Sequence, residues 1–274
     1  MTDISKQIAD NKKFPMIMGI LNVTPDSFSD GGRFKTTKDA IDYALQMAND
    51  GADIIDIGGE STRPGAEEVS LNEELRRVIP VIEGIKNNND NIKISIDTTK
   101  YEVAKKACEL GINIINDISG LQFEPRLAEL AQKYDKELII MHTKGKPKTM
   151  QNSTAYNNII EELKLYFNNQ ISLANSYGVK KIIIDTGVGF GKKLEHNLEI
   201  LKNLEEFNNF GYPQMLGISR KSFFDHLLNI KVAEERDIPT ALLHSLLLKN
   251  NLKMIRIHNV KLFSTLRTIN SALT

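Results

Sequence analysis

Short apolar runs alternate with longer amphipathic stretches along the whole chain of 274 residues. The runs are rich in Ile, Leu and Met, and their apolar positions do not alternate with polar ones. Such runs are typical of strands in a parallel sheet that is covered on both faces. We therefore expect eight strands, at Met16–Leu21, Ile54–Ile57, Ile92–Ile96, Ile112–Ile115, Leu138–Met141, Lys181–Ile184, Gln214–Ile218 and Leu252–Ile257.

A stretch with helical periodicity follows each expected strand. The expected helices lie near Lys38–Asn49, Asn72–Lys86, Tyr101–Leu110, Pro125–Tyr134, Tyr156–Tyr177, His196–Phe207, Ser222–Leu228, Arg236–Lys249 and Val260–Ser271. Strands that alternate with helices are joined by right-handed parallel crossovers. Eight such units in this length predict a (βα)8 TIM barrel, formed as a single domain over residues 1–274. A doubly wound open sheet is the alternative, but no unit has the character of an edge strand.

Three of the expected loops are long: Val23–Thr37, Ser61–Leu71 and His142–Ser153. All three follow strands, so in a barrel they lie on the same face. Long loops in compact domains are often lids over a functional site. The second of these loops presents Ser61, Thr62 and Arg63, whose donors suit phosphate or carboxylate. An ordinary strand-to-helix loop is the alternative interpretation of this segment.

Composition narrows the class of protein. The hydrophobic fraction of 41% and charged fraction of 26% are typical of a globular protein. The formal net charge is zero, so no general attraction to nucleic acid or to an anionic membrane is expected. The single cysteine, Cys108, excludes a disulfide within the chain. The first residues lack the apolar core of a signal peptide, and no apolar run is long enough to span a membrane, so we expect a cytoplasmic protein.

Polar residues occur where the expected strands end, and in a TIM barrel these ends carry the active site. They are Asn22, Asp97, Asn116, His142, Asp185, Lys221, Arg256 and His258. Structural roles are the alternative for several of them. Asp97 could cap the next helix, His142 could be a hydrogen-bonded core histidine, and Lys221 could be a solvated charge.

The last strand is the most informative. Arg256 and His258 are two residues apart, so both side chains face the same way, while Ile255 and Ile257 face the covering helices. An arginine and a histidine in the mouth of a barrel favour an anion such as phosphate, with a structural ion pair as the alternative. Asn22 offers an oxygen ligand for Mg2+, which usually keeps waters and contacts substrate phosphates.

No nucleotide-binding motif is present. The segment DTGVGFG, which starts at Asp185, has glycines that let a flat ligand approach the backbone, but it lacks the GxGxxG spacing. A GxxxxGK[ST] loop is also absent from the sequence. Carboxylates accompanied by an asparagine and a lysine suit a polar heteroaromatic ring instead. Because neighbours in a strand face opposite sides, only one of Asn116 and Asp117 can point inward.

Seven segments together carry a family resemblance. They are MGILNVTPDSFSDGG (Met18–Gly32), GADIIDIGGESTRPGA (Gly51–Ala66), SIDTTK (Ser95–Lys100), NDISG (Asn116–Gly120), IDTGVGFGK (Ile184–Lys192), SRKSF (Ser219–Phe223) and RIHNV (Arg256–Val260). In this order and spacing the chain resembles the dihydropteroate synthases of the folate pathway, which are (βα)8 barrels inhibited by sulfonamides. The resemblance implies a transferase that joins 6-hydroxymethyl-7,8-dihydropterin diphosphate to 4-aminobenzoate in an SN1-like reaction, releasing diphosphate.

The resemblance also implies roles for individual residues. Asp97, Asn116, Asp185 and Lys221 would hold the pterin, and Arg256, His258 and Asn22 with Mg2+ would hold the diphosphate, with Ser61, Thr62 and Arg63 nearby. Phe28, Arg63, Pro64, Phe190, Lys221 and Ser222 would line the aminobenzoate site. The catalytic residues would be Asp97, Asp185, Lys221, Arg256 and His258. A homodimer formed through the final helices is also implied.

Some positions depart from the family pattern. Thr143 and Lys144 are local variants after the fifth strand, and Asn259 stands where Asp is usual. His244 lies in the expected dimer helices, where small residues are usual. A pterin-binding methyltransferase barrel is an alternative, but the Arg256 and His258 pair speaks against it. A non-enzymatic pterin-binding relative is another, but the loop motifs are intact.

Overall fold

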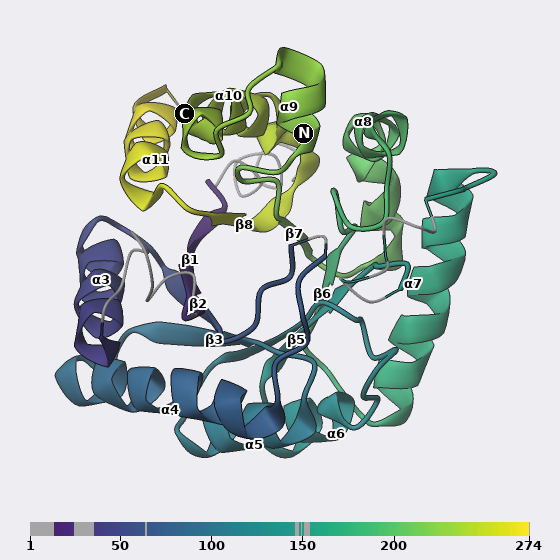
Figure 1. Cartoon of the computed structure of the whole chain (residues 1–274). Coiled ribbons are helices and arrows are strands. Elements are labelled where there is room, and N and C mark those ends of the chain that lie inside the picture. Colours follow the sequence, from purple (N-terminus) through teal and green to yellow (C-terminus); the bar gives the residue numbers. More distant parts are fainter. Residues whose placement is uncertain are drawn as a thin grey trace, which may run out of the picture.

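Eight parallel strands pair in chain order and close on themselves, with the helices arranged around the outside of the ring (Figure 1). The computed structural model describes residues 14–24, 36–63, 65–145, 148, 150 and 154–273. The (βα)8 barrel is thus confirmed, and the open sheet is wrong because β1 pairs with both β2 and β8.

The strands agree with the apolar runs of the sequence to within about two residues at most ends. They are β1 (Met16–Asn22), β2 (Ile54–Gly58), β3 (Lys93–Asp97), β4 (Ile114–Asp117), β5 (Glu137–Met141), β6 (Ile182–Asp185), β7 (Gln214–Leu216) and β8 (Leu252–Ile257). β4 starts two residues later than expected, because its pairing with β3 begins where Ile114 meets Ser95. β7 ends before Gly217, where the chain turns into the barrel mouth.

The helices are α3 (Thr37–Asn49), α4 (Leu71–Asn88), α5 (Tyr101–Glu109), α6 (Leu127–Lys133), α7 (Ile159–Ser176), α8 (Leu194–Lys202), α9 (Phe223–Leu228), α10 (Asp237–Leu247) and α11 (Val260–Leu273). One expected helix, at His196–Phe207, is in fact α8 followed by a 3-10 helix at Leu204–Phe210. Asn203 separates them, because its side chain donates to the carbonyl oxygen of Glu199 at 2.8 Å. None of the described helices combines the length and the hydropathy needed to cross a bilayer.

The inside of the barrel is divided into two layers. The lower layer, toward the amino ends of the strands, is a cluster of buried apolar side chains: Met18, Ile54, Ile114, Ile139, Ile183, Met215 and Met254. The inward positions next along the strands, at their carboxyl ends, are polar: Asp56, Asp97, Asn116, Asp185 and Arg256. A packed apolar floor therefore supports a polar layer at the face where the βα loops emerge.

Candidate active site

A cavity of about 790 Å³ opens above the polar layer. Most of the residues expected at the site line it: Asn22, Ser61, Thr62, Arg63, Asp97, Asn116, Asp185, Phe190, Lys221, Ser222, Arg256 and His258. Two further expected residues, Phe28 and Pro64, lie outside the described part of the chain. The structure thus brings together side chains that follow or end seven strands of the barrel.

Arg256 ties the acidic side chains of the polar layer together. Its Nε donates to Asp56 Oδ2 at 2.6 Å, and its Nη2 donates to Asp97 Oδ2 at 2.8 Å. Asn116 Nδ2 also donates to Asp56 Oδ2, at 3.1 Å. The sequence analysis did not predict a role for Asp56. A lone carboxylate at an inward position of an apolar strand was the feature that could have revealed it.

Charge is unbalanced in this layer. Three carboxylates, of Asp56, Asp97 and Asp185, face two cationic side chains, of Arg256 and Lys221. Burial raises the pKa of Asp97 to about 7, and the nearby positive charge of Arg256 only partly opposes this shift. Burial also raises the pKa of Asp185, against the opposing effect of Lys221. The layer therefore attracts positive charge or a proton.

Several buried polar atoms of the layer have no hydrogen-bond partner within the described residues. They are Asp56 Oδ1, Asn116 Oδ1 and Ser95 Oγ, on three consecutive strands. Buried acceptors left in this state are destabilising unless a ligand or water completes them. Of these residues only Asn116 lines the cavity, so a planar ring that carries N–H donors would satisfy its Oδ1.

Lys221 lies on the opposite side of the cavity from this cluster of acceptors, after β7. Its ammonium is 4.3 Å from the centre of the Phe190 ring and donates to the carbonyl oxygen of Val188. Burial lowers the pKa of Lys221 to about 8, although Asp185 opposes the shift. Gly189 is required beside it: its φ is +88°, and a Cβ there would come within 2.7 Å of Lys221 Cδ.

His142 does not line the cavity, and its alternative as a core histidine is confirmed. Its Nδ1 is 2.9 Å from the ammonium of Lys192, which also donates to the carbonyl oxygens of Gly187 at 2.8 Å and Phe190 at 3.0 Å. Burial and the Lys192 charge lower the pKa of His142, so the ring is neutral and accepts at Nδ1. Lys192, which the sequence analysis did not single out, thus fastens the loop that carries Phe190.

His258 and the residue after it are both held by partners from other loops. The Ser219 hydroxyl accepts from the His258 backbone N–H at 3.1 Å and lies 3.0 Å from the ring Nδ1. Asn259 donates to Asp237 Oδ2 at 3.0 Å, and Arg220 Nε donates to Asp237 Oδ1 at 2.6 Å. The unusual Asn259 therefore has a physical explanation, because an aspartate there would face the carboxylate of Asp237.

The described residues of the cavity offer few ligands for a metal ion. Over the part of the chain that the structure describes, no group of three or more His, Cys, Asp or Glu side chains could hold an ion. Asn22 does line the same cavity as Arg256 and His258. This donor set fits Mg2+ bound largely by waters and by the oxygens of a diphosphate.

Comparison with known proteins gives one consistent result. The family model described as "Pterin binding enzyme" matches residues 18–258. A dihydropteroate synthase from Synechocystis sp. is 43% identical over 272 residues, which cover 98% of this chain and 94% of that protein.

Solved structures of dihydropteroate synthases are also similar to this chain. A Yersinia pestis dihydropteroate synthase in complex with a sulfonamide drug superposes with a TM-score of 0.88 at 40% identity, covering 95% of this chain and 94% of that one. A Xanthomonas albilineans dihydropteroate synthase with 4-aminobenzoic acid gives a TM-score of 0.87 at 35% identity, covering 96% and 94%. From the barrel, the polar cavity and these matches, the chain belongs to the pterin-binding enzymes, and among them to the dihydropteroate synthases.

Proposed function

We propose that this cavity joins 6-hydroxymethyl-7,8-dihydropterin diphosphate to 4-aminobenzoate, giving 7,8-dihydropteroate and diphosphate. The observation that carries the assignment of residues is the polar layer on its apolar floor. There Arg256 joins Asp56 to Asp97, and the cavity is lined by Asn116, whose Oδ1 has no partner among the described residues. The names of the relatives support the reaction.

The pterin ring lies in the polar layer in this proposal. Its amino group and ring N–H groups donate to Asp97, Asn116 and Asp185, which are nearly fully buried. The Asn116 Oδ1, which has no partner among the described residues and lies on a side chain that lines the cavity, supports this position, because a ring with N–H donors satisfies it. Lys221 contributes a donor from the other side of the cavity.

The diphosphate lies above the ring, where Arg256, His258 and Asn22 line the cavity and Ser61, Thr62 and Arg63 border it. The guanidinium and the imidazole stabilise the negative charge that grows on the leaving oxygen. The chemistry that Mg2+ supplies when bound through Asn22 is neutralisation of the diphosphate.

Bond breaking precedes bond making in this proposal. The C–O bond of the pterin methylene breaks, and diphosphate leaves with the electron pair. The carboxylates of Asp97 and Asp185 stabilise the cationic dihydropterin that remains, because the layer already carries an excess of negative charge. The amine nitrogen of 4-aminobenzoate then forms the C–N bond and releases a proton to water or diphosphate.

The aminobenzoate site is formed by Phe190, Lys221 and Ser222 with Arg63, Phe28 and Pro64 from the long loops. Lys221 stands over the Phe190 ring, so a second ring can stack there while the ammonium attracts the carboxylate. A sulfonamide, which resembles 4-aminobenzoate in shape, is expected to compete at this site.

The reaction is tested directly. The protein is incubated with the pterin diphosphate, 4-aminobenzoate and Mg2+, and dihydropteroate and free diphosphate are measured. Equal amounts of both products are expected, and omission of 4-aminobenzoate should remove the dihydropteroate. Failure to form dihydropteroate with folded protein would refute the proposed function.

We also propose a homodimer formed through α10 and α11. Ile238, Leu242 and Leu246 lie at four-residue spacing on α10 and are 58%, 62% and 71% exposed. On α11, Ile269 and Leu273 are also largely exposed. The unusual His244 does not belong to this face, because it is fully buried and its Nδ1 lies 2.8 Å from the Thr240 carbonyl oxygen.

Sedimentation velocity tests the dimer. Leu246→Glu should shift the protein toward monomer, because a charge on an apolar interface is strongly destabilising. Leu165→Glu on α7 is the matched control, since Leu165 is 63% exposed but lies on another helix. A wild-type protein that is monomeric at micromolar concentration would refute the dimer.

We also propose a cytoplasmic location. The free, buried thiol of Cys108 supports it, because disulfides are rare in reducing compartments.

A further inference from the structure

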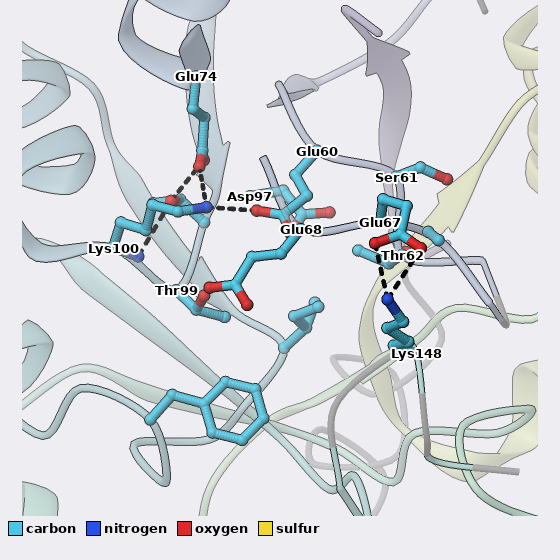
Figure 2. A pocket seen from close by; sticks show the side chains of 14 residues that line it. Glu60, Ser61, Thr62, Glu67, Glu68, Glu74, Asp97, Thr99, Lys100 and Lys148 are labelled. Carbon is cyan, nitrogen blue, oxygen red and sulfur yellow. Dashed lines mark hydrogen bonds and ion pairs between the residues drawn. The ribbon is translucent and has the colours of Figure 1, made fainter. Parts of the chain in front are cut away.

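Lys100 lies outside the cavity but contacts two of the segments that form it. It is the residue before α5 and follows the turn at Asp97. Its ammonium donates to Glu74 Oε2 at 2.6 Å and to Glu60 Oε2, as Figure 2 shows. Glu74 belongs to the first turn of α4, and only 1% of its side chain is exposed. One ammonium thus joins a helix to the start of the Glu60–Ser70 loop.

The same network reaches the end of β3. Thr98 Oγ1 donates to Glu74 Oε1 at 2.6 Å and accepts from the Lys100 backbone N–H at 3.1 Å. Thr98 directly follows Asp97, and its own N–H donates to the Asn116 carbonyl oxygen at 3.2 Å. Asp97 is therefore held by Thr98 as well as by Arg256.

The loop is held differently from Asp97. Before it, Gly59 is fixed against α4: Arg77 Nη1 donates to its carbonyl oxygen at 2.7 Å, and a Cβ there would lie 2.8 Å from Val78 Cγ1. Glu60 comes next, and the chain then passes Ser61 and Thr62. At this point it lies between two hollows, the cavity and a second pocket of about 280 Å³ that is also lined by Ser61, Thr62 and Asp97.

Other bonds in this part of the loop are local: the Arg63 N–H donates to Ser61 Oγ at 3.5 Å, and the Ala66 N–H donates to the Arg63 carbonyl oxygen at 3.1 Å. Farther along, Glu67 pairs with Lys148 at 2.8 Å, but their side chains are 79% and 61% exposed. Exposed pairs of this kind contribute about 0–1 kcal/mol. Glu60 and Lys100 are only 22% and 19% exposed, so their bond is less screened. Burial disfavours the ammonium of Lys100, but its hydrogen bonds to Glu60 and Glu74 raise its pKa, so it stays charged.

We propose that Lys100 is a positioning residue that directs Ser61, Thr62 and Arg63 over the cavity, and that it thereby serves the second substrate and the diphosphate end of the first, but not the pterin ring. This inference rests on the proposed function of the cavity. Asp97 keeps Arg256 and the Thr98 to Glu74 bond when Lys100 is lost, so the pterin site persists. The Glu60 end of the loop loses its charged partner.

Steady-state kinetics of Glu60→Gln and Lys100→Met test the proposal. The KM for 4-aminobenzoate should rise roughly tenfold in both, since a lost charge-assisted hydrogen bond and a misplaced loop have effects of this order. The calorimetric affinity for a non-reactive pterin should change less than about threefold. Lys100→Arg, which keeps the charge, should recover most of the KM. Lys106→Met is the matched control and should change nothing, because Lys106 lies on α5 with a 57% exposed side chain.

The outcomes separate the hypotheses. An unchanged KM for 4-aminobenzoate, or an equal loss of pterin affinity, would overturn the role of Lys100. Glu60→Gln keeps the Lys100 to Glu74 pair and decides the matter if Lys100→Met does not fold. A wild-type protein without turnover would instead refute the proposed function.

Discussion

The two layers inside the barrel are formed by the same strands, but one is apolar and the other buries charged side chains. The floor is the cluster of buried apolar side chains that includes Met18 and Met254. These side chains need no polar partners and only have to fill the available volume. The polar layer above it buries three carboxylates, and each needs a partner: Arg256 for Asp56 and Asp97, and the Gly187 N–H with the Lys221 charge for Asp185. Of the two layers, the floor therefore contributes more to stability, while the polar layer suits binding and chemistry.

The largest effect is expected from Arg256→Met. The change removes the proposed anion ligand and leaves Asp56 and Asp97 without their shared cation. We expect kcat/KM to fall roughly 10³-fold, the order seen when a preorganised charge-stabilising donor is lost. Stopped-flow measurement of diphosphate release checks this. Diphosphate release at the wild-type rate would show that Arg256 does not stabilise the leaving group, and that the polar layer is not specialised for this step.

The next effect concerns pH and Asp97. Because burial raises the pKa of this carboxyl to about 7, it is protonated below that pH and loses the charge that would strengthen its proposed hydrogen bond from a pterin N–H. Pterin affinity should therefore weaken by up to about tenfold for each pH unit below 7. Calorimetry between pH 5.5 and 8 measures the slope.

Asp97→Asn is the control for that slope. The amide does not titrate, so the variant should bind pterin more weakly at pH 8 but with a flat profile below pH 7. A wild-type profile that is itself flat would show that Asp97 is ionised throughout this range.

The floor should respond in the opposite way. Ile139→Ala removes buried methyl and methylene groups from the fully buried cluster and should lower the free energy of unfolding by about 2–5 kcal/mol. The variant should keep kcat within a few-fold at a temperature where it is folded. Chemical denaturation gives the first quantity. A large loss of kcat in folded protein would show that the floor and the polar layer are not separable.

The smallest effect is expected at the boundary. Ser95 is fully buried, its hydroxyl has no partner among the described residues, and it pairs in register with both Asp56 and Ile114. Ser95→Ala removes an unsatisfied polar group and should stabilise the protein by about 1 kcal/mol. Pterin affinity should stay within about twofold, since Ser95 is the inward residue before Asp97 on β3 and pairs with Ile114 of the floor. A larger loss would move Ser95 into the binding layer.

The sequence alone was enough to predict the eight βα units, because the local pattern of apolar residues distinguishes buried parallel strands from amphipathic helices. It also located most of the cavity, because polar residues at the carboxyl ends of successive strands must meet at one face. Strand alternation predicted that only one of Asn116 and Asp117 points inward, and the bond of Asn116 to Asp56 shows that it is Asn116.

The pairing of the buried charges could not be predicted from the sequence and is seen only in the tertiary structure. Arg256 bonds to Asp56 and Asp97, which are 200 and 159 residues away, and Lys100 joins Glu60 to Glu74 across 40 and 26 residues. Likewise, His142 is a structural residue because Lys192 reaches it from the next loop. A strand pattern shows which face a side chain lies on, but the partner that stabilises a buried charge is set by barrel closure and register, which bring distant strands within bonding distance.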